Sequence, residues 1–323
     1  MNVLITSAGR RVKVIQYFRQ TLNEIGGKVI ATDCDKNAPA IYFADENEIT
    51  PRINDEGYLS SIITVCKKYN VDAVVSLIDP ELEILAKNKK QFDMIGVKLI
   101  LSPLNMIQYS FDKQETYNYL SKLGIPCVPT FSKISDIDLY LDKKEYSFPL
   151  VVKPRKGSAS IGIEKVNNKE ELNILIEKNN DIQLIIQPYY KKREFGIDVY
   201  IDMITGELVD LFIKEKIRMR SGETDKSIAI HNNKIESLVK EFVMKTNFRG
   251  PIDIDCFEYK GKYYISEVNP RFGGGYPHAY EAGCNFVTYI LNNLKGQENK
   301  SYTTFTYKSN SIMRKYDNLL VLD

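Results

Sequence analysis

The acidic and amide residues of two predicted strands near the end of the sequence have the spacing of a metal site. If their hairpin closes through the three residues 260–262, Asp255 lies directly opposite Glu267 and Asp253 lies opposite Asn269. Directly paired side chains have Cβ atoms about 4.5–5.5 Å apart, so two carboxylates and an amide oxygen would converge on one face. Magnesium prefers such oxygen ligands when substrate phosphates complete its shell. The pattern therefore predicts a magnesium site.

This prediction depends on the register of the hairpin. A slip of one residue would place Asp255 and Glu267 on opposite faces, and a solvated surface hairpin is the alternative interpretation. The EVNPR run beside an apolar strand favours the metal site. Arg271 ends this run, keeps its charge, and can bind a phosphate or carboxylate through two parallel hydrogen bonds. The glycines 273–275 and His278 follow and are expected to shape an acceptor pocket, with His278 more often a packed residue than a base.

A lysine at the end of an apolar strand gives a second candidate site. The strand at 150–153 ends in Lys153, and a loop of small residues runs from Gly157 to Gly162. A lysine there can neutralise phosphate oxygens, and backbone N–H groups of the loop can cover them. Ser158 and Ser160 in this loop are candidate nucleotide contacts. The alternative is an ordinary β-hairpin with a flexible tip.

A strand that runs into a proline-containing linker gives a third candidate site. The segment from Gln187 through Pro188 to Tyr190 exposes unpaired backbone donors and acceptors, and an adenine edge needs one of each. Glu194 lies seven residues after Gln187, within reach of a ribose. The alternative is an edge strand with a charged turn.

Four basic residues alternate along the predicted strand at 212–220. Lys214, Lys216, Arg218 and Arg220 would all lie on one face. Such a row could face an anionic substrate or phosphates, or it could be a solubilising edge strand. Lys216 and Arg218 are the members we expect in a catalytic site.

The first hundred residues alternate between short apolar runs and helical patterns, which predicts a parallel sheet with helices on both faces. The predicted strands are 2–7, 28–32, 72–76 and 98–101, and the predicted helices are 11–22, 59–69 and 81–92. Asp33 and the loop at 79–81 end such strands and would form one wall of a substrate cleft. A nicotinamide site at Asp33 is a weak alternative, because the turn at 7–11 lacks the three-glycine spacing.

The second half changes to long alternating strands, which predicts an antiparallel α+β region. Its predicted strands are 150–153, 161–166, 183–188, 196–203, 208–219, 252–259 and 263–268. Its predicted helices are 169–178 and 235–246, after a short helix opened by Ser102 as cap and Pro103, and a longer one at 112–123.

The amino-acid composition limits the kinds of partner and ligand that the chain is expected to bind. Lys plus Arg is 44 and Asp plus Glu is 42, so the net charge of +2 gives no support for a nucleic-acid or membrane-surface partner. The five cysteines form no CxxC spacing and are expected to be reduced, mostly buried thiols in a cytoplasmic protein. Two histidines make a zinc site improbable. No apolar run approaches the roughly 20 residues that span a bilayer.

These motifs, in this order, resemble the ATP-grasp superfamily, which includes biotin carboxylase, D-alanine–D-alanine ligase and the carbamoyl phosphate synthetase large subunit. The chain looks like the small single-module proteins described as carbamoyl phosphate synthetase-like. The resemblance implies a Rossmann-like, pre-ATP-grasp α/β domain at 1–103, an α+β ATP-grasp subdomain with a lid at 104–190, and an antiparallel subdomain carrying the metal site at 191–323.

The resemblance also implies roles for the nucleotide-binding candidates. Lys113 resembles the first ATP-contacting lysine, although a surface lysine at a helix start is the alternative. Lys153 resembles the second, which contacts the α- and β-phosphates. The lid is poorer in glycine than that of biotin carboxylase.

Gln187 stands where a glutamate commonly meets the adenine amino group, and an amide oxygen can still accept. The backbones of Pro188 and Tyr190 would then meet the adenine edge, and Glu194 the ribose.

Asp255, Glu267 and Asn269 resemble the ligands of two Mg²⁺ ions, for which Mn²⁺ could substitute, and Arg271 resembles the arginine that holds the transferring phosphate. The implied activity is ADP-forming carboxylate–amine ligation: ATP converts a small-molecule carboxylate into an acyl phosphate, and an amine attacks it. A homodimer is compatible with this reading. One module argues against full carbamoyl phosphate synthesis. A degenerate nucleotide sensor and a nicotinamide oxidoreductase are the rival functions.

Overall fold

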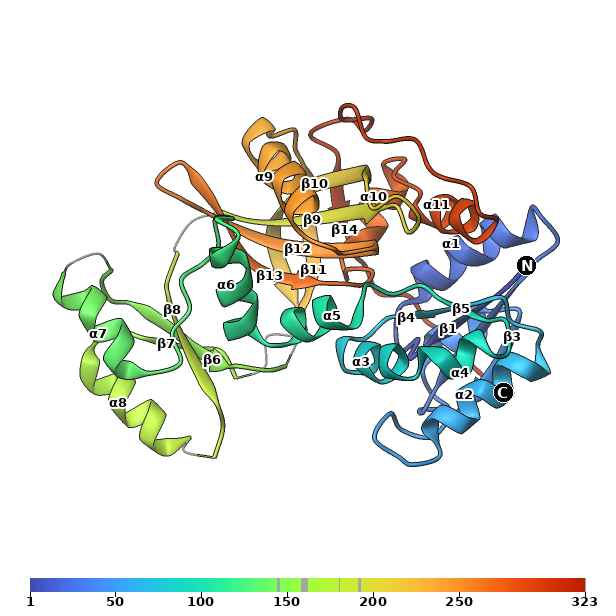
Figure 1. The fold of residues 1–323 in the computed structure, drawn as a ribbon, viewed down its shortest axis with the longest axis horizontal. Helices are drawn as coiled ribbons and strands as arrows, with labels where there is room; N and C mark the ends of the chain where they lie inside the picture. The colour runs from blue at the N-terminus through green and yellow to red at the C-terminus, as the bar shows by residue number, and fades with distance from the viewer. Residues whose placement is uncertain (144–145, 158–161, 180, 191–192, 323) are drawn as a thin grey trace.

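The computed structural model describes residues 1–322 except 144–145, 158–161, 180 and 191–192. Figure 1 shows three sheets in a row, with the N-terminal parallel sheet at one end, a large antiparallel sheet in the middle and a small sheet at the other end. This confirms the predicted fold class of a parallel α/β unit followed by antiparallel sheets. No described helix is both long and apolar enough to cross a membrane.

The N-terminal sheet is parallel throughout, with strand order β3-β2-β1-β4-β5. Its strands are β1 (Asn2–Thr6), β2 (Lys28–Asp33), β3 (Glu46–Ile49), β4 (Ala73–Ser76) and β5 (Lys98–Leu99). The central strand β1 is buried on both faces, because Val3 and Ile5 pack into one apolar cluster and Leu4 into another.

Helices cover both faces of this sheet, as predicted. They are α1 (Val12–Asn23), α2 (Tyr58–Lys68), α3 (Asp79–Lys87) and α4 (Lys89–Asp93), with a 3-10 helix η1 (Pro39–Phe43). The predicted single helix at 81–92 is wrong, because the chain leaves helical geometry at Asn88 and forms two helices. Strand β3 was not predicted, because its residues, ENEI, contain no apolar run.

The small sheet has the order β7-β6-β8, with β6 (Leu150–Pro154), β7 (Glu164–Val166) and β8 (Leu184–Pro188). The helices α7 (Ile134–Asp142) and α8 (Lys169–Lys178) pack against it through a shared apolar cluster. Two helices, α5 (Leu104–Phe111) and α6 (Lys113–Lys122), connect it to the N-terminal sheet (Figure 1). The predicted Ser102 cap of α5 is wrong: the Ser102 hydroxyl donates to the Arg249 carbonyl at 2.8 Å.

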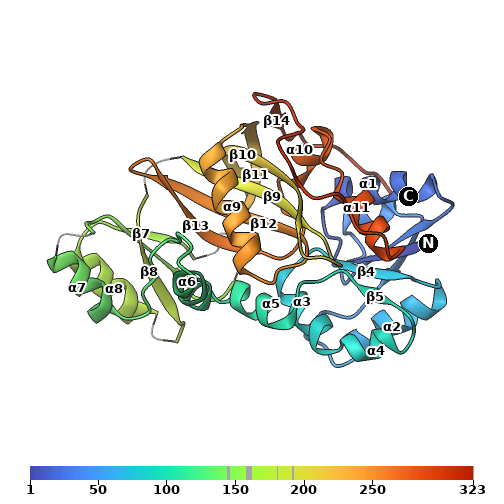
Figure 2. The ribbon, with the colours of Figure 1, turned by 45° about the horizontal axis from the view of Figure 1, so that its top comes forward.

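The large sheet is antiparallel, with order β13-β12-β9-β10-β11-β14. Its strands are β9 (Glu194–Ile201), β10 (Leu208–Arg220), β11 (Glu223–Ala229), β12 (Gly250–Tyr259), β13 (Lys262–Asn269) and β14 (Ile312–Arg314). Helix α9 (Asn233–Lys245) lies across one face, as Figure 2 shows.

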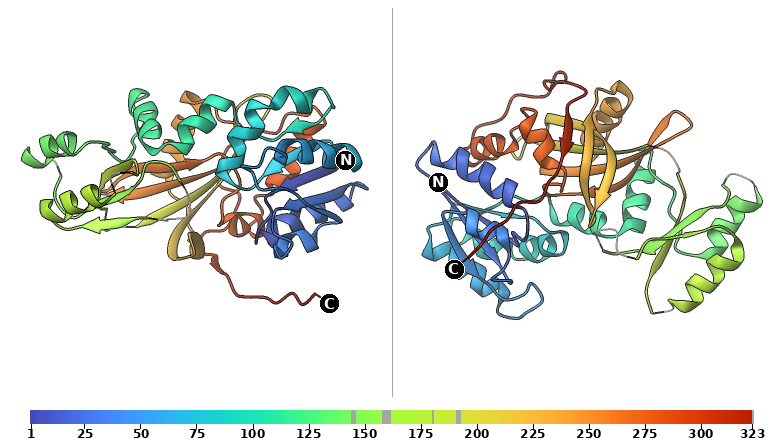
Figure 3. Two further views of the ribbon diagram at one scale, coloured as in Figure 1. Left: turned by 90° about the horizontal axis from the view of Figure 1, so that it is seen from below. Right: turned by 180° about the vertical axis from the view of Figure 1, so that it is seen from behind.

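The other face of the large sheet shares a core with the N-terminal sheet. Helices α10 (Tyr276–Glu281) and α11 (Phe286–Leu294) pack there, and one apolar cluster joins Phe18 of α1 to Phe212 of β10 and Tyr276. Figure 3 shows the last residues crossing from β14 toward the N-terminal sheet. Beside this shared core, Asp79 at the start of α3 contacts Arg271, which follows β13.

Candidate active site

The predicted pairing of the acidic hairpin is confirmed. Asp255 is paired with Glu267, and Asp253 with Asn269, across strands β12 and β13. Asp253 and Asp255 are two residues apart, so their side chains lie on the same face of the sheet. The side chains are partly buried, with 14% of Asp253 and 19% of Asp255 exposed, and each lies within 4 Å of a cationic side chain.

The predicted three-residue turn of this hairpin is wrong. The observed turn is one residue shorter, and a β-bulge restores the predicted register. Tyr259 pairs with Lys262, so the turn contains two residues, Lys260 (φ 50°) and Gly261 (φ 74°). This shorter turn would shift the pairing by one residue. A β-bulge between Asp255 and Cys256 inserts one extra residue on β13 and restores the predicted pairs.

Lysines from three other elements act on these carboxylates. Lys216 Nζ lies 2.6 Å from Asp255 Oδ1 and donates to Glu194 Oε1 at 2.8 Å. Lys153, at the end of β6, is buried, and this burial lowers its pKa, while Glu267 acts to raise it. Burial conversely raises the pKa of Glu267, against the attraction of Lys113 and Lys153. The predicted Lys113, Lys153 and Lys216 therefore lie within electrostatic reach of the acidic hairpin.

Arg271 joins this hairpin to the N-terminal sheet. Its Nη2 donates to Asp79 Oδ2 at 2.8 Å, and its Nη1 lies 3.8 Å from Asp253 Oδ2. Burial alone would lower the pKa of Arg271, but Asp79 and Asp253 raise it overall. Arg271 Nε and Asp79 Oδ1 are both buried and have no hydrogen-bond partner among the described residues. The predicted wall at 79–81 thus contacts the site through Asp79.

The glycines after Arg271 allow the loop to approach the sheet closely. A Cβ on Gly273 would lie 2.5 Å from Asp253 Cγ, and one on Gly275 would overlap Lys214 Cε. Lys214 is fully buried and pairs with Asp198, which faces Asp253 across β9 and β12. Asp198 was not predicted; its signal is a carboxylate in the middle of the apolar run of β9.

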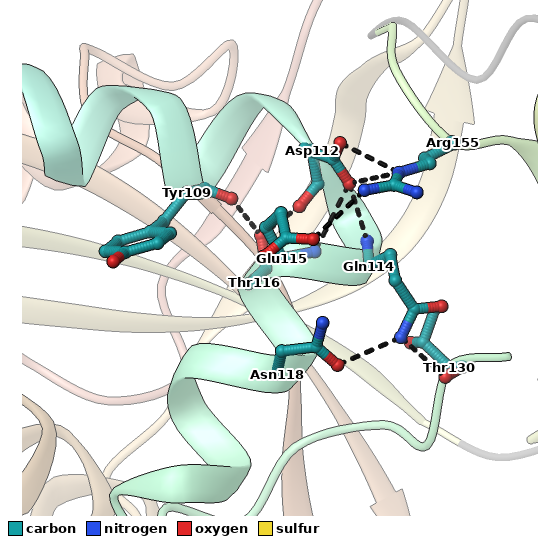
Figure 4. Close-up of polar contacts among 8 residues, drawn as sticks. All are labelled: Tyr109, Asp112, Gln114, Glu115, Thr116, Asn118, Thr130 and Arg155. Atoms are coloured by element: carbon teal, nitrogen blue, oxygen red, sulfur yellow. Dashed lines mark hydrogen bonds and ion pairs between the residues drawn. The ribbon is translucent and has the colours of Figure 1, made fainter. Parts of the chain in front are cut away.

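The helix that begins at Lys113 is fixed by Asp112 (Figure 4). Asp112 Oδ1 accepts hydrogen bonds from the N–H groups of Gln114 and Glu115, and both its oxygens accept from Arg155 Nε at 2.8 Å. Lys113 Nζ in turn donates to the Gly157 carbonyl at 2.6 Å. The start of α6 is thereby tied to the segment that follows Lys153.

The predicted adenine segment is connected to the same network. Gln187 Nε2 donates to Thr130 Oγ1 at 2.8 Å, and the Thr130 carbonyl accepts from Gln114 (Figure 4). This orients the Gln187 amide and leaves its oxygen without a donor in the described part of the chain. Pro188 ends β8, and the Tyr190 ring stacks on Tyr259 with centroids 4.7 Å apart.

The structure separates Arg218 from this cluster. A bulge after Lys216 interrupts the alternation of β10, and Arg218 is 61% exposed and lies 3.8 Å from Asp225. The expected single basic face is therefore wrong. Asp33 accepts from the N–H of Gly9 at 2.7 Å. Ser158 and Ser160 lie outside the described residues.

His278 is a packed residue in this structure. Its Nδ1 lies 2.8 Å from Ser227 Oγ and its Nε2 lies 3.1 Å from Ser311 Oγ. Burial, with a contribution from Lys214, lowers its pKa to about 4.

The donor set of the hairpin fits Mg²⁺. Asp255 and Glu267 offer carboxylate oxygens and Asn269 offers an amide oxygen. Among the described residues, no group of three or more His, Cys, Asp or Glu side chains is placed to hold a metal ion. Oxygen ligands with vacancies for phosphate and water are what Mg²⁺ requires.

Comparison with known proteins assigns two parts of the chain to families. Residues 3–100 match the PylC-like N-terminal domain, and residues 110–275 match the ATP-grasp domain. The chain is 24% identical over 266 residues to the carbamoyl phosphate synthase large chain of Clostridium perfringens, covering 76% of this chain but only 24% of that relative.

Solved structures share the fold. The biotin carboxylase domain of Hydrogenobacter thermophilus 2-oxoglutarate carboxylase, in complex with MgADP, ADP and bicarbonate, has a TM-score of 0.74 at 17% identity, covering 96% of this chain and 73% of that one. L-amino acid ligase from Bacillus licheniformis has a TM-score of 0.66 at 21% identity, covering 91% and 74%. With its ATP-grasp match extending over half of its residues, this chain belongs to the ATP-grasp family.

Proposed function

We propose that the chain is an ADP-forming ligase that joins a small-molecule carboxylate to an amine at the expense of ATP. The observation that carries this proposal is the pairing of Asp255 with Glu267 and of Asp253 with Asn269, beside Arg271 and Lys216. This arrangement combines oxygen ligands for a cation with fixed positive charges for phosphate oxygens. A phosphoryl-transfer site requires both.

The reaction has two steps. A carboxylate oxygen attacks the γ-phosphorus of ATP, a new O–P bond forms, and the bond between that phosphorus and the β,γ-bridging oxygen breaks to release ADP. The amine then attacks the acyl carbon, a C–N bond forms, the C–O bond to phosphate breaks, and the amine proton passes to a base or to water. Inorganic phosphate and the amide leave.

The side chains of this chain supply positions and charges for these steps. Lys113 and Lys153 would contact the nucleotide phosphates, and the buried Lys153 would exchange its attraction to Glu267 for one to phosphate. Arg271 would hold the transferring phosphoryl group or the acyl phosphate, since a fixed guanidinium stabilises charge that develops in the transition state. Asp79 keeps that guanidinium oriented.

Residues from the predicted adenine segment would bind the other end of ATP. The Gln187 amide oxygen would accept from the adenine amino group, because Thr130 already fixes the amide nitrogen. The backbones of Pro188 and Tyr190 would meet the adenine edge. Glu194, now paired with Lys216, would accept from the ribose hydroxyls.

Asp255, Glu267 and Asn269 would hold Mg²⁺. When bound, Mg²⁺ would neutralise charge on the β- and γ-phosphate oxygens. Lys216 contacts Asp255 in this structure, so this lysine would have to share that carboxylate with the cation or turn toward phosphate.

Two structural neighbours support the proposal, since one was solved with MgADP and bicarbonate and the other is an L-amino acid ligase. The test is ADP release from ATP and Mg²⁺, measured across a matrix of carboxylates and amines. The proposal expects release that requires both substrates, and loss of it in the Glu267→Gln variant with unchanged folding. ATP binding without stimulated release would instead indicate a nucleotide sensor.

A further inference from the structure

Lys216 lies between two carboxylates that belong to different parts of the candidate active site. Its Nζ donates to Glu194 Oε1 at 2.8 Å and lies 2.6 Å from Asp255 Oδ1. Glu194 begins β9 and is the candidate ribose ligand, whereas Asp255 on β12 is a candidate metal ligand. The side chain of Lys216 is only 6% exposed, so these two carboxylates, rather than water, balance its charge.

The strand between Lys216 and Asp255 leaves room for the lysine side chain. β9 lies between β10 and β12, and its Gly196 is paired with Asp255. A Cβ on Gly196 would lie 3.1 Å from Lys216 Cε, which is closer than most real Cβ contacts. The missing side chain therefore lets the lysine cross β9 and reach a carboxylate on β12.

Lys216 and a divalent cation would compete for Asp255. Mg²⁺ binds carboxylate oxygens at about 2.0–2.1 Å, so a Mg²⁺ on Asp255 Oδ1 would lie within about 5 Å of the lysine nitrogen in its present position. Like charges repel each other at that separation, and more strongly at a buried site than in water. Asp255 therefore cannot keep its contact with Lys216 and bind a metal at full strength.

The remaining ligands of the hairpin are too few to hold a metal without phosphate. Glu267 and Asn269 contribute one carboxylate and one amide, and no third His, Cys, Asp or Glu side chain among the described residues completes the site. Mg²⁺ in proteins is commonly held by one or two carboxylates together with substrate phosphates. A triphosphate would supply oxygen ligands for the metal and, at the same time, anionic partners for Lys216.

We propose that Lys216 determines the order of binding: it excludes a free divalent cation from the hairpin, so that the metal enters together with the nucleotide. When phosphates are present, Lys216 exchanges Asp255 for phosphate oxygens and leaves Asp255 to the metal. Glu194 connects the two events, because the ribose hydroxyls would compete with Lys216 for the same carboxylate. This role rests on the proposed function, which supplies the nucleotide and the metal.

Equilibrium dialysis of Mn²⁺ with the full chain tests this role, with and without a non-hydrolysable ATP analogue on both sides of the membrane. The wild-type chain should bind Mn²⁺ weakly by itself and tightly with the analogue. Lys216→Met keeps a long unbranched side chain and removes its charge. Without nucleotide, this variant should bind Mn²⁺ about tenfold or more tightly than wild type, because the like charge beside the metal is gone.

Further variants connect that gain to the charge of Lys216. Arg218→Met is the matched control, since Arg218 lies on the same strand but is 61% exposed beside Asp225, and nucleotide-free Mn²⁺ binding should stay weak. Lys216→Arg keeps the charge and should also bind weakly. Lys216→Gln is a second neutral variant and should show the gain, and adding Asp255→Asn to Lys216→Met should abolish it. Thermal denaturation shows which variants are folded.

Two results would overturn this role. One is Mn²⁺ binding by the wild-type chain that is as tight without the analogue as with it. The other is the absence of any gain in the folded neutral variants of Lys216.

The same samples distinguish this role from the ligase proposal. If Mn²⁺ binds with the analogue through Asp255 and Glu267, but the neutral variants show no gain, the metal site is supported and the role of Lys216 is contradicted. If the neutral variants show the gain, but carboxylates and amines never stimulate ADP release, the role of Lys216 is supported and the ligase function is contradicted.

Discussion

Arg271 and Asp79 form an ion pair of 2.8 Å between Nη2 and Oδ2, although 192 residues separate them in the chain. Arg271 follows the metal hairpin, and Asp79 begins α3 after the buried strand β4. The pair therefore joins the N-terminal unit to the β12–β13 hairpin that carries the candidate site. One contact therefore joins the predicted wall at 79–81 to the arginine that we propose as a phosphate ligand.

This contact predicts energetic coupling. In a double-mutant cycle with Asp79→Asn and Arg271→Gln, the two changes should be non-additive by about 1–3 kcal/mol in the free energy of unfolding, because the residues share one buried ion pair. Urea denaturation measures each corner of the cycle. The exposed pair Arg19–Asp45 is the control, with coupling below about 1 kcal/mol. Additive effects at the buried pair would show that it does not join the two parts.

The glycine loop predicts a steric effect. Gly273→Ala should lower the free energy of unfolding by about 1–3 kcal/mol and reduce turnover, because the new Cβ would displace Asp253. Gly57→Ala is the control, since its nearest neighbour would lie 3.8 Å away, and its effect should be at most about 1 kcal/mol. Thermal denaturation and ADP release measure both. Equal effects of the two changes would contradict the close packing of the loop.

His278 predicts a pH dependence of stability. Its pKa is lowered to about 4 in the folded chain, against about 6.5 in an unfolded one. Between these values the unfolded chain binds the extra proton, so stability falls as the pH drops from about 7 to 4, by on the order of 3 kcal/mol from this residue.

Asp210 acts in the opposite direction, because burial raises its pKa to about 6 in the folded chain. The contribution of His278 is therefore measured as the difference between wild type and His278→Gln in urea denaturation at several pH values. Loss of stability on acidification should be smaller in the variant. An identical pH profile for both proteins would contradict a neutral, buried His278.

Two substitutions of Asp112, the N-cap of α6, should lower stability to different degrees. Asp112→Ala removes both the cap and the Arg155 ion pair, and should cost about 1 kcal/mol or more and weaken ATP binding, because Lys113 begins the helix. Asp112→Asn keeps a capping oxygen and should cost less. Thermal denaturation and ATP titration measure the series. Unchanged ATP affinity in Asp112→Ala would contradict a contact between Lys113 and the nucleotide.

The strands and helices of strong periodicity were predictable from the sequence. The continuous apolar run of β1 indicated a buried parallel strand, and α8 was predicted with its observed bounds. The polar strand β3 gave no such signal, because its stability comes from its neighbour β2. The domain boundaries at 103 and 190 remain predictions.

Residue types and their spacing in the sequence predicted part of the site, but not the features that depend on irregular strand geometry. The pairing of Asp255 with Glu267 was predicted on the assumption of a three-residue turn. The turn is one residue shorter, and the pairing is still correct because the bulge adds one residue to β13. Local sequence does not reveal such a bulge. The bulge after Lys216 likewise turns Arg218 toward Asp225.

The ion pair of Arg11 with Glu223 was not predicted, because the two residues lie more than two hundred positions apart in the sequence. Its only local signal is a pair of arginines directly after a buried strand.

The Mg²⁺ dependence of ATP affinity tests the central claim most directly. Calorimetric titration of ATP with and without Mg²⁺ should show tighter binding with the metal in the wild-type chain. That gain should largely disappear in Glu267→Gln and in Asp255→Asn, with the metal-free affinity retained. An undiminished Mg²⁺ effect in both folded variants would contradict a metal site on this hairpin.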